Sequence, residues 1–229
     1  MICDNLAHIR ATIAQAAQKA GKNPETVKLV AVSKTVPTDA MLEAVHCGQM
    51  VFGENYLQEA ADKMARLPAA IRWHCIGHLQ SNKTRRAVEL FDVIETVDRW
   101  KVALALDNHA RLLHKDLSIL LQVNIGREPQ KSGVLPEAAE PLLRKIAAAT
   151  SLRVLGLMTI PPYSSDPEHS RPYFSALNQL AQRLAACGLF ANNACVELSM
   201  GMSNDYPVAI EEGATLVRVG TALFGARQR

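Results

Sequence analysis

Residues 27–34 read VKLVAVSK, a short, mostly apolar run that ends in a lysine. A run that stays apolar instead of alternating is typical of a strand buried on both faces of a parallel sheet. A helix is expected next, over residues 38–47, with Thr38 as its N-cap and Gly48 at its end. A buried strand followed directly by a helix indicates an α/β protein.

The same alternation of strand and helix continues along the chain. Strands are expected over residues 27–33, 50–53, 72–76, 91–95, 117–124, 153–158, 195–198 and 216–219. Helices are expected between them, and one more precedes them, because Ile2, Leu6, Ile9, Ile13, Ala17 and Ala20 share one helical face that Gly21 closes. Eight such units predict a single (β/α)8 TIM-type barrel with an extra N-terminal helix, one domain over residues 1–229.

Composition excludes several classes of protein. The chain has 25 basic and 22 acidic residues, a balance that does not suit a nucleic-acid binder. No apolar run approaches the roughly 20 residues of a membrane helix. The five cysteines form no Cys-x-x-Cys pair and no targeting segment is recognised, so we expect a cytoplasmic protein with reduced thiols. No residues have metal-ligand spacing, so no metal is expected.

Residues at the carboxyl ends of the strands should converge on one mouth of the barrel, where active sites of this fold lie. Lys34 follows the first strand, and its stem starts from buried backbone. Desolvation favours a neutral lysine amine, which is the form that makes a Schiff base. The alternative is a lysine that extends from the barrel rim into water. His78 follows the third strand, and we also expect it to line the mouth.

The loops after the seventh and eighth strands are the usual phosphate site of this fold. Here they read SMGMS at 199–203 and GTALFG at 220–225, with glycines and hydroxyls suited to an anion. The alternative is ordinary turn chemistry, with Ser203 as a helix cap. Arg218 should face inward with Gly220, where either the Glu197 carboxylate or a ligand atom would be its acceptor. A Schiff-base lysine opposite a phosphate cradle favours pyridoxal 5′-phosphate (PLP), and a sugar-phosphate aldolase stays possible.

Several motifs resemble the pyridoxal-phosphate homeostasis proteins, in order and with the spacing of that family. They are VAVSKT at 30–35, FGENYLQE at 52–59, WHCIGHLQSNK at 73–83, LLQVNIGREPQKSG at 120–133, GLMTIPP at 156–162, LSMGMSNDY at 198–206 and VRVGTALFG at 217–225. The resemblance covers residues 29–225. It implies a barrel similar to the N-terminal domain of bacterial alanine racemase, and PLP held as an internal aldimine on Lys34.

Other roles are implied by position in these motifs. Ser199, Gly220 and Thr221 would hold the phosphate, with the backbone of Met200 nearby. Arg218 would face the pyridine nitrogen, and Asn55 would lie near the cofactor ring. Lys131 matches a lysine linked in the family to PLP handling. The family often has a second lysine two residues after the Schiff-base lysine, and here that residue is Val36.

The expected chemistry is limited. An arginine does not give up its proton, so Arg218 would leave the pyridine nitrogen unprotonated and carbanions less stabilised. Alanine racemases take a second base, a tyrosine, from another domain of a partner subunit, and no such domain is recognised before the last residue, Arg229. We therefore expect a monomeric PLP carrier in intracellular PLP homeostasis, with little or no turnover and with PLP-dependent apoenzymes as recipients. The alternative is a small PLP-dependent amino-acid racemase-like enzyme.

Overall fold

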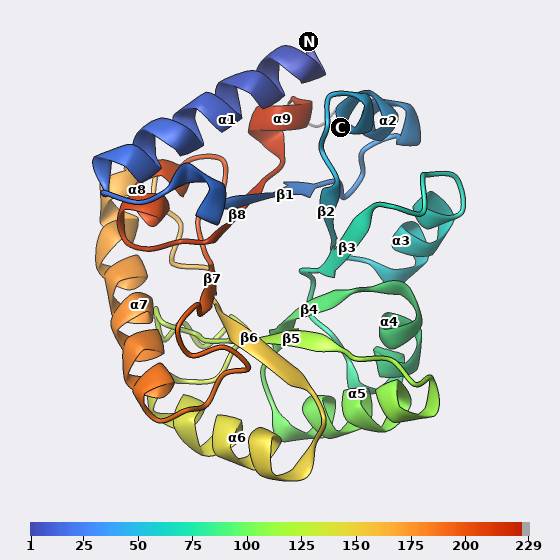
Figure 1. Ribbon diagram of the computed structural model, residues 1–229, viewed down its shortest axis with the longest axis vertical. Helices are drawn as coiled ribbons and strands as arrows, with labels where there is room; N and C mark the ends of the chain where they lie inside the picture. The colour runs from blue at the N-terminus through green and yellow to red at the C-terminus, as the bar shows by residue number, and fades with distance from the viewer. Residues whose placement is uncertain (226–229) are drawn as a thin grey trace.

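The predicted barrel is confirmed by the computed structural model, which describes residues 1–225. The strands are parallel and close in sequence order, with β1 paired to both β2 and β8. Figure 1 shows them as a central ring surrounded by helices. The strands are β1 (Lys28–Val32), β2 (Val51–Glu54), β3 (Arg72–Cys75), β4 (Val93–Val97), β5 (Ser118–Gln122), β6 (Arg153–Met158), β7 (Glu197–Ser199) and β8 (Leu216–Val219).

The helices follow the predicted order, with small differences at their ends. They are α1 (Ile2–Lys19), α2 (Thr38–His46), α3 (Leu57–Met64), α4 (Thr84–Leu90), α5 (Trp100–Leu112), α6 (Pro136–Ala149), α7 (Arg171–Ala186), α8 (Tyr206–Glu211) and α9 (Thr221–Phe224). Short 3-10 turns cover Pro24–Thr26, Ser81–Lys83 and Pro167–Ser170. Pro37, and not Thr38, is the N-cap of α2, and its carbonyl accepts the first helical hydrogen bond from Met41.

Most strands differ from the predicted ranges by one or two residues at their ends, and β5 is shorter than predicted for a clear reason. The apolar run over residues 117–124 predicts a strand that reaches Asn124, but β5 ends at Gln122. The Asn124 side chain donates to the Glu128 carbonyl at 2.8 Å and accepts from the Glu128 amide at 3.1 Å. These bonds fold the chain back into the loop of residues 126–133, which periodicity does not reveal.

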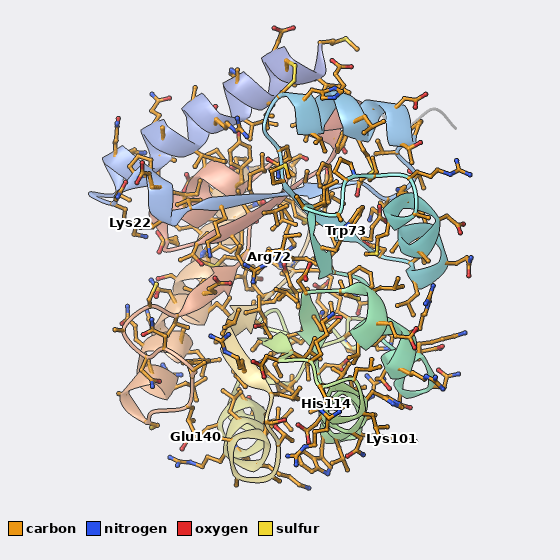
Figure 2. The ribbon with its side chains drawn as sticks, turned by 45° about the vertical axis from the view of Figure 1, so that its right-hand side comes forward. Lys22, Arg72, Trp73, Lys101, His114 and Glu140 are labelled. Carbon is orange, nitrogen blue, oxygen red and sulfur yellow. A yellow bond between two sulfur atoms is a disulfide. The ribbon has the colours of Figure 1, made fainter. Side chains whose placement is uncertain are left out.

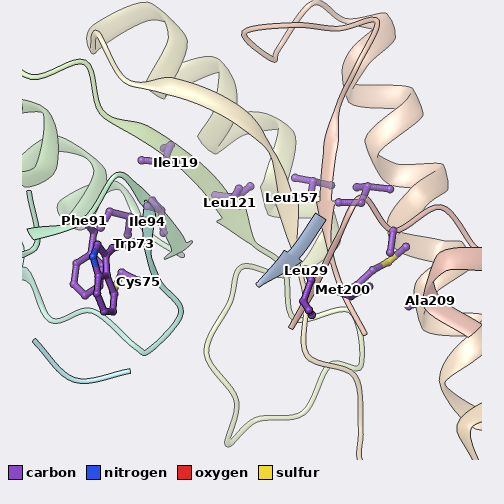
Figure 3. Packing of buried hydrophobic residues seen from close by; sticks show 14 of the residues in the cluster. Leu29, Trp73, Cys75, Phe91, Ile94, Ile119, Leu121, Leu157, Met200 and Ala209 are labelled. Carbon is purple, nitrogen blue, oxygen red and sulfur yellow. The ribbon is translucent and has the colours of Figure 1, made fainter. Parts of the chain in front are cut away.

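Charged side chains lie mostly on the outside, as Figure 2 shows for Lys22, Lys101 and Glu140. The main apolar core lies between the strands and the helices. Figure 3 shows part of it, with Trp73 and Cys75 of β3 beside Phe91 and Ile94. A second, smaller core lies inside the barrel and consists of Val30, Leu120, Met158 and Leu216. In the part of the chain that the structure describes, no helix is long and apolar enough to cross a membrane.

The extra helix α1 lies against α8 and α9 on the outside of the barrel (Figure 1). The Asn5 side chain donates to the Leu223 carbonyl of α9 at 2.9 Å, and Lys19 pairs with Glu211 of α8 at 2.6 Å. Arg10 donates to the carbonyls of Cys47 and Gly48, after α2. Helix α1 therefore links α2, near the start of the chain, to α8 and α9, more than 150 residues later in the sequence.

The expectation of five reduced thiols is wrong for one pair of cysteines. Cys3 of α1 and Cys47 after α2 form a disulfide, with 5.6 Å between their Cα atoms. The pairing arises because α1 crosses the end of α2, a contact that cysteine spacing in the sequence does not show. Cys75 is free and buried, and Cys187 and Cys195 are free and exposed.

Peptide mapping without reductant should therefore recover Cys3 linked to Cys47. Cys3→Ser should lower the free energy of unfolding by about 2–4 kcal/mol, because the bond closes a loop between residues 44 apart. Cys187→Ser is the matched control and should leave urea unfolding unchanged. Equal unfolding midpoints for Cys3→Ser and the oxidised wild type would contradict this prediction.

Candidate functional site

A cavity of about 300 Å³ opens at the carboxyl ends of the strands. This is within the range of small-ligand sites, and it is the face at which the sequence predicts the site. Five of the predicted site residues line it: Lys34, Asn55, Arg218, Gly220 and Thr221. Val32 and Ile76 add apolar wall, as do Ile160, Pro161, Pro162 and Phe224.

Lys34 enters the cavity because of strand alternation. Leu29 and Ala31 of β1 pack outward into the main core, while Val30 lies in the small core inside the barrel. Val32 continues the inward side and lines the cavity, and Lys34 follows it two residues later. Lys34 is half-buried.

Arg218 forms the floor of the cavity and is 4% exposed. Its Nη1 donates to Ser199 Oγ at 2.5 Å, and its Nη2 donates to the Thr159 carbonyl at 2.8 Å. A guanidinium has five N–H donors, and these two bonds are the ones that it makes within residues 1–225. The remaining donors are available to a ligand in the cavity.

The charge of Arg218 is balanced from below by Glu95, which is fully buried. Ser199 Oγ donates to Glu95 Oε2 at 2.5 Å, and His74 Nδ1 lies 2.6 Å from Glu95 Oε1. Burial acts to raise the pKa of Glu95, but the His74 hydrogen bond and the charges of His74 and Arg218 outweigh it and hold the pKa below its usual value. Burial lowers the pKa of Arg218, and the charges of Glu95 and Asp205 oppose that shift.

Glu197, the carboxylate considered for Arg218 from the sequence, lies elsewhere. It pairs with Lys28 at 2.8 Å, at the amino ends of the strands. Glu95 escaped the sequence analysis because it lies within an expected strand, with no motif of its own. Only the closed barrel brings β4 opposite β8.

The loops after β7 and β8 meet at one side of the cavity. Ser203 Oγ accepts hydrogen bonds from the backbone amides of Gly220 at 3.3 Å and Ala222 at 3.4 Å. Gly201 has φ +90°, and a Cβ there would lie 2.6 Å from the Ala209 Cβ, so only glycine fits this turn. The backbone amides and the hydroxyls of Ser203 and Thr221 at this side of the cavity are donors of the kind that bind a phosphate group.

The matched family model is alanine racemase, N-terminal domain, over residues 5–228. The pyridoxal phosphate homeostasis protein of Vibrio cholerae is 43% identical over 231 residues, which cover 99% of this chain and 96% of that protein. The protein of the same name from Pseudomonas aeruginosa is 44% identical, with coverage of 99% and 96%.

The chain belongs to the pyridoxal phosphate homeostasis protein family. The structure of PipY from Synechococcus elongatus, described as having PLP bound, has a TM-score of 0.85 at 38% identity and covers 98% of this chain and 100% of that one. Alanine racemase of Clostridium difficile has a TM-score of 0.72 at 14% identity and covers 99% of this chain but 58% of that one. That second likeness shows a shared barrel alone.

Four of the residues that the sequence analysis assigned to the site do not line the cavity. The Ser199 hydroxyl is occupied between Arg218 and Glu95, and Met200 is buried in the outer core (Figure 3). His78 lines a neighbouring pocket that shares Asn55, and its Nδ1 lies 3.0 Å from Ser132 Oγ. Lys131 donates to the Pro161 carbonyl at 2.8 Å and pairs with Glu128.

Some cavity residues received no individual role from the sequence. Ser203 was part of the segment at 199–203 considered for an anion, with a helix cap as the alternative, and its bonds to the loop after β8 depend on β7 and β8 being neighbours. Asp205 accepts from the Met202 amide at 2.7 Å and from Ser170 Oγ at 2.9 Å, which fixes the loop that carries Ser203. No group of three or more possible metal ligands occurs within the described part of the chain.

The buried charge pair predicts a pH-dependent effect of Glu95→Gln. The substitution should cost about 3–5 kcal/mol at pH 7, because Arg218 loses its buried counter-ion. The folded pKa of Glu95 lies below its unfolded value of about 4, so its stabilisation is present above that pH and is lost as the pH falls through the folded pKa. The loss of unfolding free energy caused by Glu95→Gln should therefore become smaller at acidic pH.

Urea unfolding at pH 7 and at stepwise lower pH measures this difference. Glu140→Gln, a change to an exposed carboxylate on α6, is the control and should have little effect at any of these pH values. A cost for Glu95→Gln that stays constant down to the acid limit of folding would contradict the assignment of a low pKa to Glu95.

Proposed function

We propose that this protein binds PLP through Lys34, contributes to intracellular PLP homeostasis as a carrier, and has little or no catalytic turnover. The observation that carries this proposal is the single cavity into which Lys34, Arg218 and the loops after β7 and β8 all project. The family relationship supports it, as does the likeness to PipY, whose structure is described with PLP bound.

The cavity fits each part of PLP with a group of suitable chemistry. The Lys34 amine would hold the aldehyde group by a condensation that releases water. The free N–H donors of Arg218 suit an aromatic nitrogen that accepts a hydrogen bond. The backbone amides of Gly220 and Ala222, with the Ser203 and Thr221 hydroxyls, suit the phosphate. Asn55 lines both this cavity and the neighbouring pocket, and its amide would suit a polar substituent of the ring.

Arg218 limits the chemistry that this site can support. PLP, when bound, supplies an electron sink that is strongest when its pyridine nitrogen carries a proton. Glu95 holds Arg218 as a cation by way of Ser199, and a guanidinium keeps its proton at any physiological pH. Arg218 therefore donates a hydrogen bond without transferring a proton.

A racemase also needs a second base, and Tyr163 is the phenol among the cavity-lining residues. Its side chain is 87% exposed, and it makes no hydrogen bond within residues 1–225. A general base must be held within hydrogen-bond reach of the proton that it removes. The exposed position of Tyr163 therefore favours a carrier over the racemase-like alternative. PLP-dependent apoenzymes would receive the cofactor, and we propose that the carrier is a monomer.

Borohydride reduction of the PLP-loaded protein should fix a phosphopyridoxyl group on the peptide that contains Lys34. Lys34→Ala should abolish the absorbance of the bound chromophore, because Lys34 is the one lysine among the described residues that line the cavity. Lys101→Ala, on the outer surface of α5, is the control and should keep the full absorbance. An unmodified Lys34 after loading would overturn the PLP assignment and favour direct attack on a sugar phosphate.

Turnover separates the carrier from the enzyme. Purified PLP-loaded protein should neither racemise nor decarboxylate alanine, serine or threonine above the rate of free PLP. Robust activity that disappears in Tyr163→Phe would instead establish the racemase-like function and identify its second base.

The phosphate cradle predicts a ligand-specific defect. Ser203→Ala should weaken PLP binding about tenfold, the effect of losing one hydrogen bond to a charged group. Binding of pyridoxal, which lacks the phosphate, should change little in the same variant. Equal losses for the two ligands, measured by titration of the absorbance change, would show that Ser203 acts on the loop and not on the phosphate.

A further inference from the structure

A buried cluster of charges lies directly behind the strand end that carries Lys34. Lys63 of α3 has a side chain that is 7% exposed, and its partners are Glu54 at the end of β2 and Glu59 in the first turn of α3. Its Nζ donates to Glu54 Oε1 at 2.7 Å and to Glu59 Oε1 at 2.6 Å. Together Glu54, Glu59 and Lys63 form what we call the α3 cluster.

The α3 cluster holds the backbone on both sides of Lys34. Before it, the Ser33 carbonyl accepts a 2.5 Å hydrogen bond from Lys63 Nζ, and Ser33 Oγ donates to Glu54 Oε1 at 2.7 Å. After it, the Thr35 amide donates to Glu59 Oε1 at 2.5 Å. Both peptide groups that flank Lys34 are thus bonded to one set of charged side chains.

The backbone at this point needs to be held. Thr35 has φ +62°, a left-handed conformation that a β-branched residue rarely adopts. Such strain persists only where the surroundings determine it, and it gathers at functional sites. The bond from the Thr35 amide to Glu59 supplies that restraint immediately after Lys34.

Stability alone does not account for the α3 cluster. Burial raises the pKa of Glu54 despite hydrogen bonds from Lys63 and Ser33, and Glu54 Oε2 is buried without a hydrogen-bond partner among the described residues. Apolar side chains of similar volume usually hold a helix to a sheet at least as well as a buried ion pair. Apolar side chains, however, cannot make directional bonds to a carbonyl and an amide.

We propose that Lys63 and Glu59 are positioning residues that fix the two peptide groups around Lys34 and so direct its amine into the cavity. This inference rests on the proposed function, in which Lys34 holds PLP. It assigns to the buried face of α3 a part in cofactor binding, although α3 itself lies outside the barrel.

Lys115 offers a matched control. Its Nζ also donates to backbone carbonyls, those of Val88 and Phe91, both at 2.8 Å, and it is also partly buried. It lies between α5 and the start of β5, at the end of the barrel opposite to the cavity. Lys115→Met thus removes a comparable set of bonds far from Lys34.

Two readouts test the proposal. In the protein without PLP, amide hydrogen exchange over residues 33–36 reports the backbone directly. Glu59→Ala should accelerate exchange at Thr35 about tenfold or more, and Glu59→Gln should restore protection, because its carbonyl oxygen can accept the same bonds. In the loaded protein, Glu59→Ala should lower the visible circular dichroism of bound PLP and hasten its loss about tenfold.

Lys63→Met leaves the buried Glu54 carboxylate and the partly buried Glu59 carboxylate without their cation, so this variant can fail to fold. The double variant Lys63→Met with Glu54→Gln removes a positive and a negative charge together and tests the same bonds. It should also lose protection at residues 33–36 and dichroism of bound PLP. Lys115→Met should lower only the thermal unfolding midpoint.

Wild-type exchange and dichroism in both Glu59→Ala and the double variant would overturn the proposal. The same changes in Lys115→Met would overturn it too, by showing that lost stability alone loosens this segment. Failure of the wild type to take up PLP would refute the proposed function. In that case, loss of protection at the Thr35 amide in Glu59→Ala would still support the claim that Glu59 fixes the backbone around Lys34.

Discussion

Pairing of β1 with β8 is the contact on which the site depends. Lys28 to Ala31 lie in register with Leu216 to Val219, and this ladder closes the barrel. It brings Lys34, near the start of the chain, to the same mouth as Arg218 and Gly220, near its end. Without closure the lysine and the anion cradle would belong to separate edges of a sheet. Helix α1 supports the junction from outside, because it contacts α2, α8 and α9.

Two clusters of buried charge lie next to residues that line the cavity. Inside the barrel, the Glu95 carboxylate, which is bonded to His74, lies close to Arg218 and favours its charged form. Outside the barrel, the α3 cluster grips the backbone beside Lys34. Burying charges costs desolvation energy, which is compensated only by good geometry and further hydrogen bonds. In both clusters these hydrogen bonds also orient groups at the cavity. The desolvation energy of the buried charges is therefore spent on the geometry of the site and not on packing of the core.

The shared barrel with alanine racemase does not by itself imply racemase chemistry. A fold of this kind supports many activities, and the residues at its mouth decide between them. Here the mouth combines a lysine, a guanidinium fixed in its charged form and an exposed tyrosine. This set is well suited to hold an aldehyde with an aromatic ring and a phosphate, and poorly suited to move protons to and from a substrate. A protein that only retains a cofactor needs the groups that hold it and does not need the groups that move protons.

The sequence alone determined the order of the strands and helices, since apolar runs and helical periods are local patterns set by which side chains must avoid water. Lys34, Arg218 and Gly220 could be assigned for the same reason: each occupies a fixed place relative to the end of its own strand. The tertiary structure alone decided the Cys3–Cys47 bond, the partnership of Glu95 with Arg218, the bonds of Ser203 and the grip of Lys63 and Glu59 on the Lys34 backbone. Most of these contacts join elements that are distant in the chain, and even the nearer ones, such as Lys63 to Ser33, depend on how helices pack on the closed barrel. Side-chain hydrogen bonds have no period that a sequence can display, and their partners are defined only once the backbone has closed.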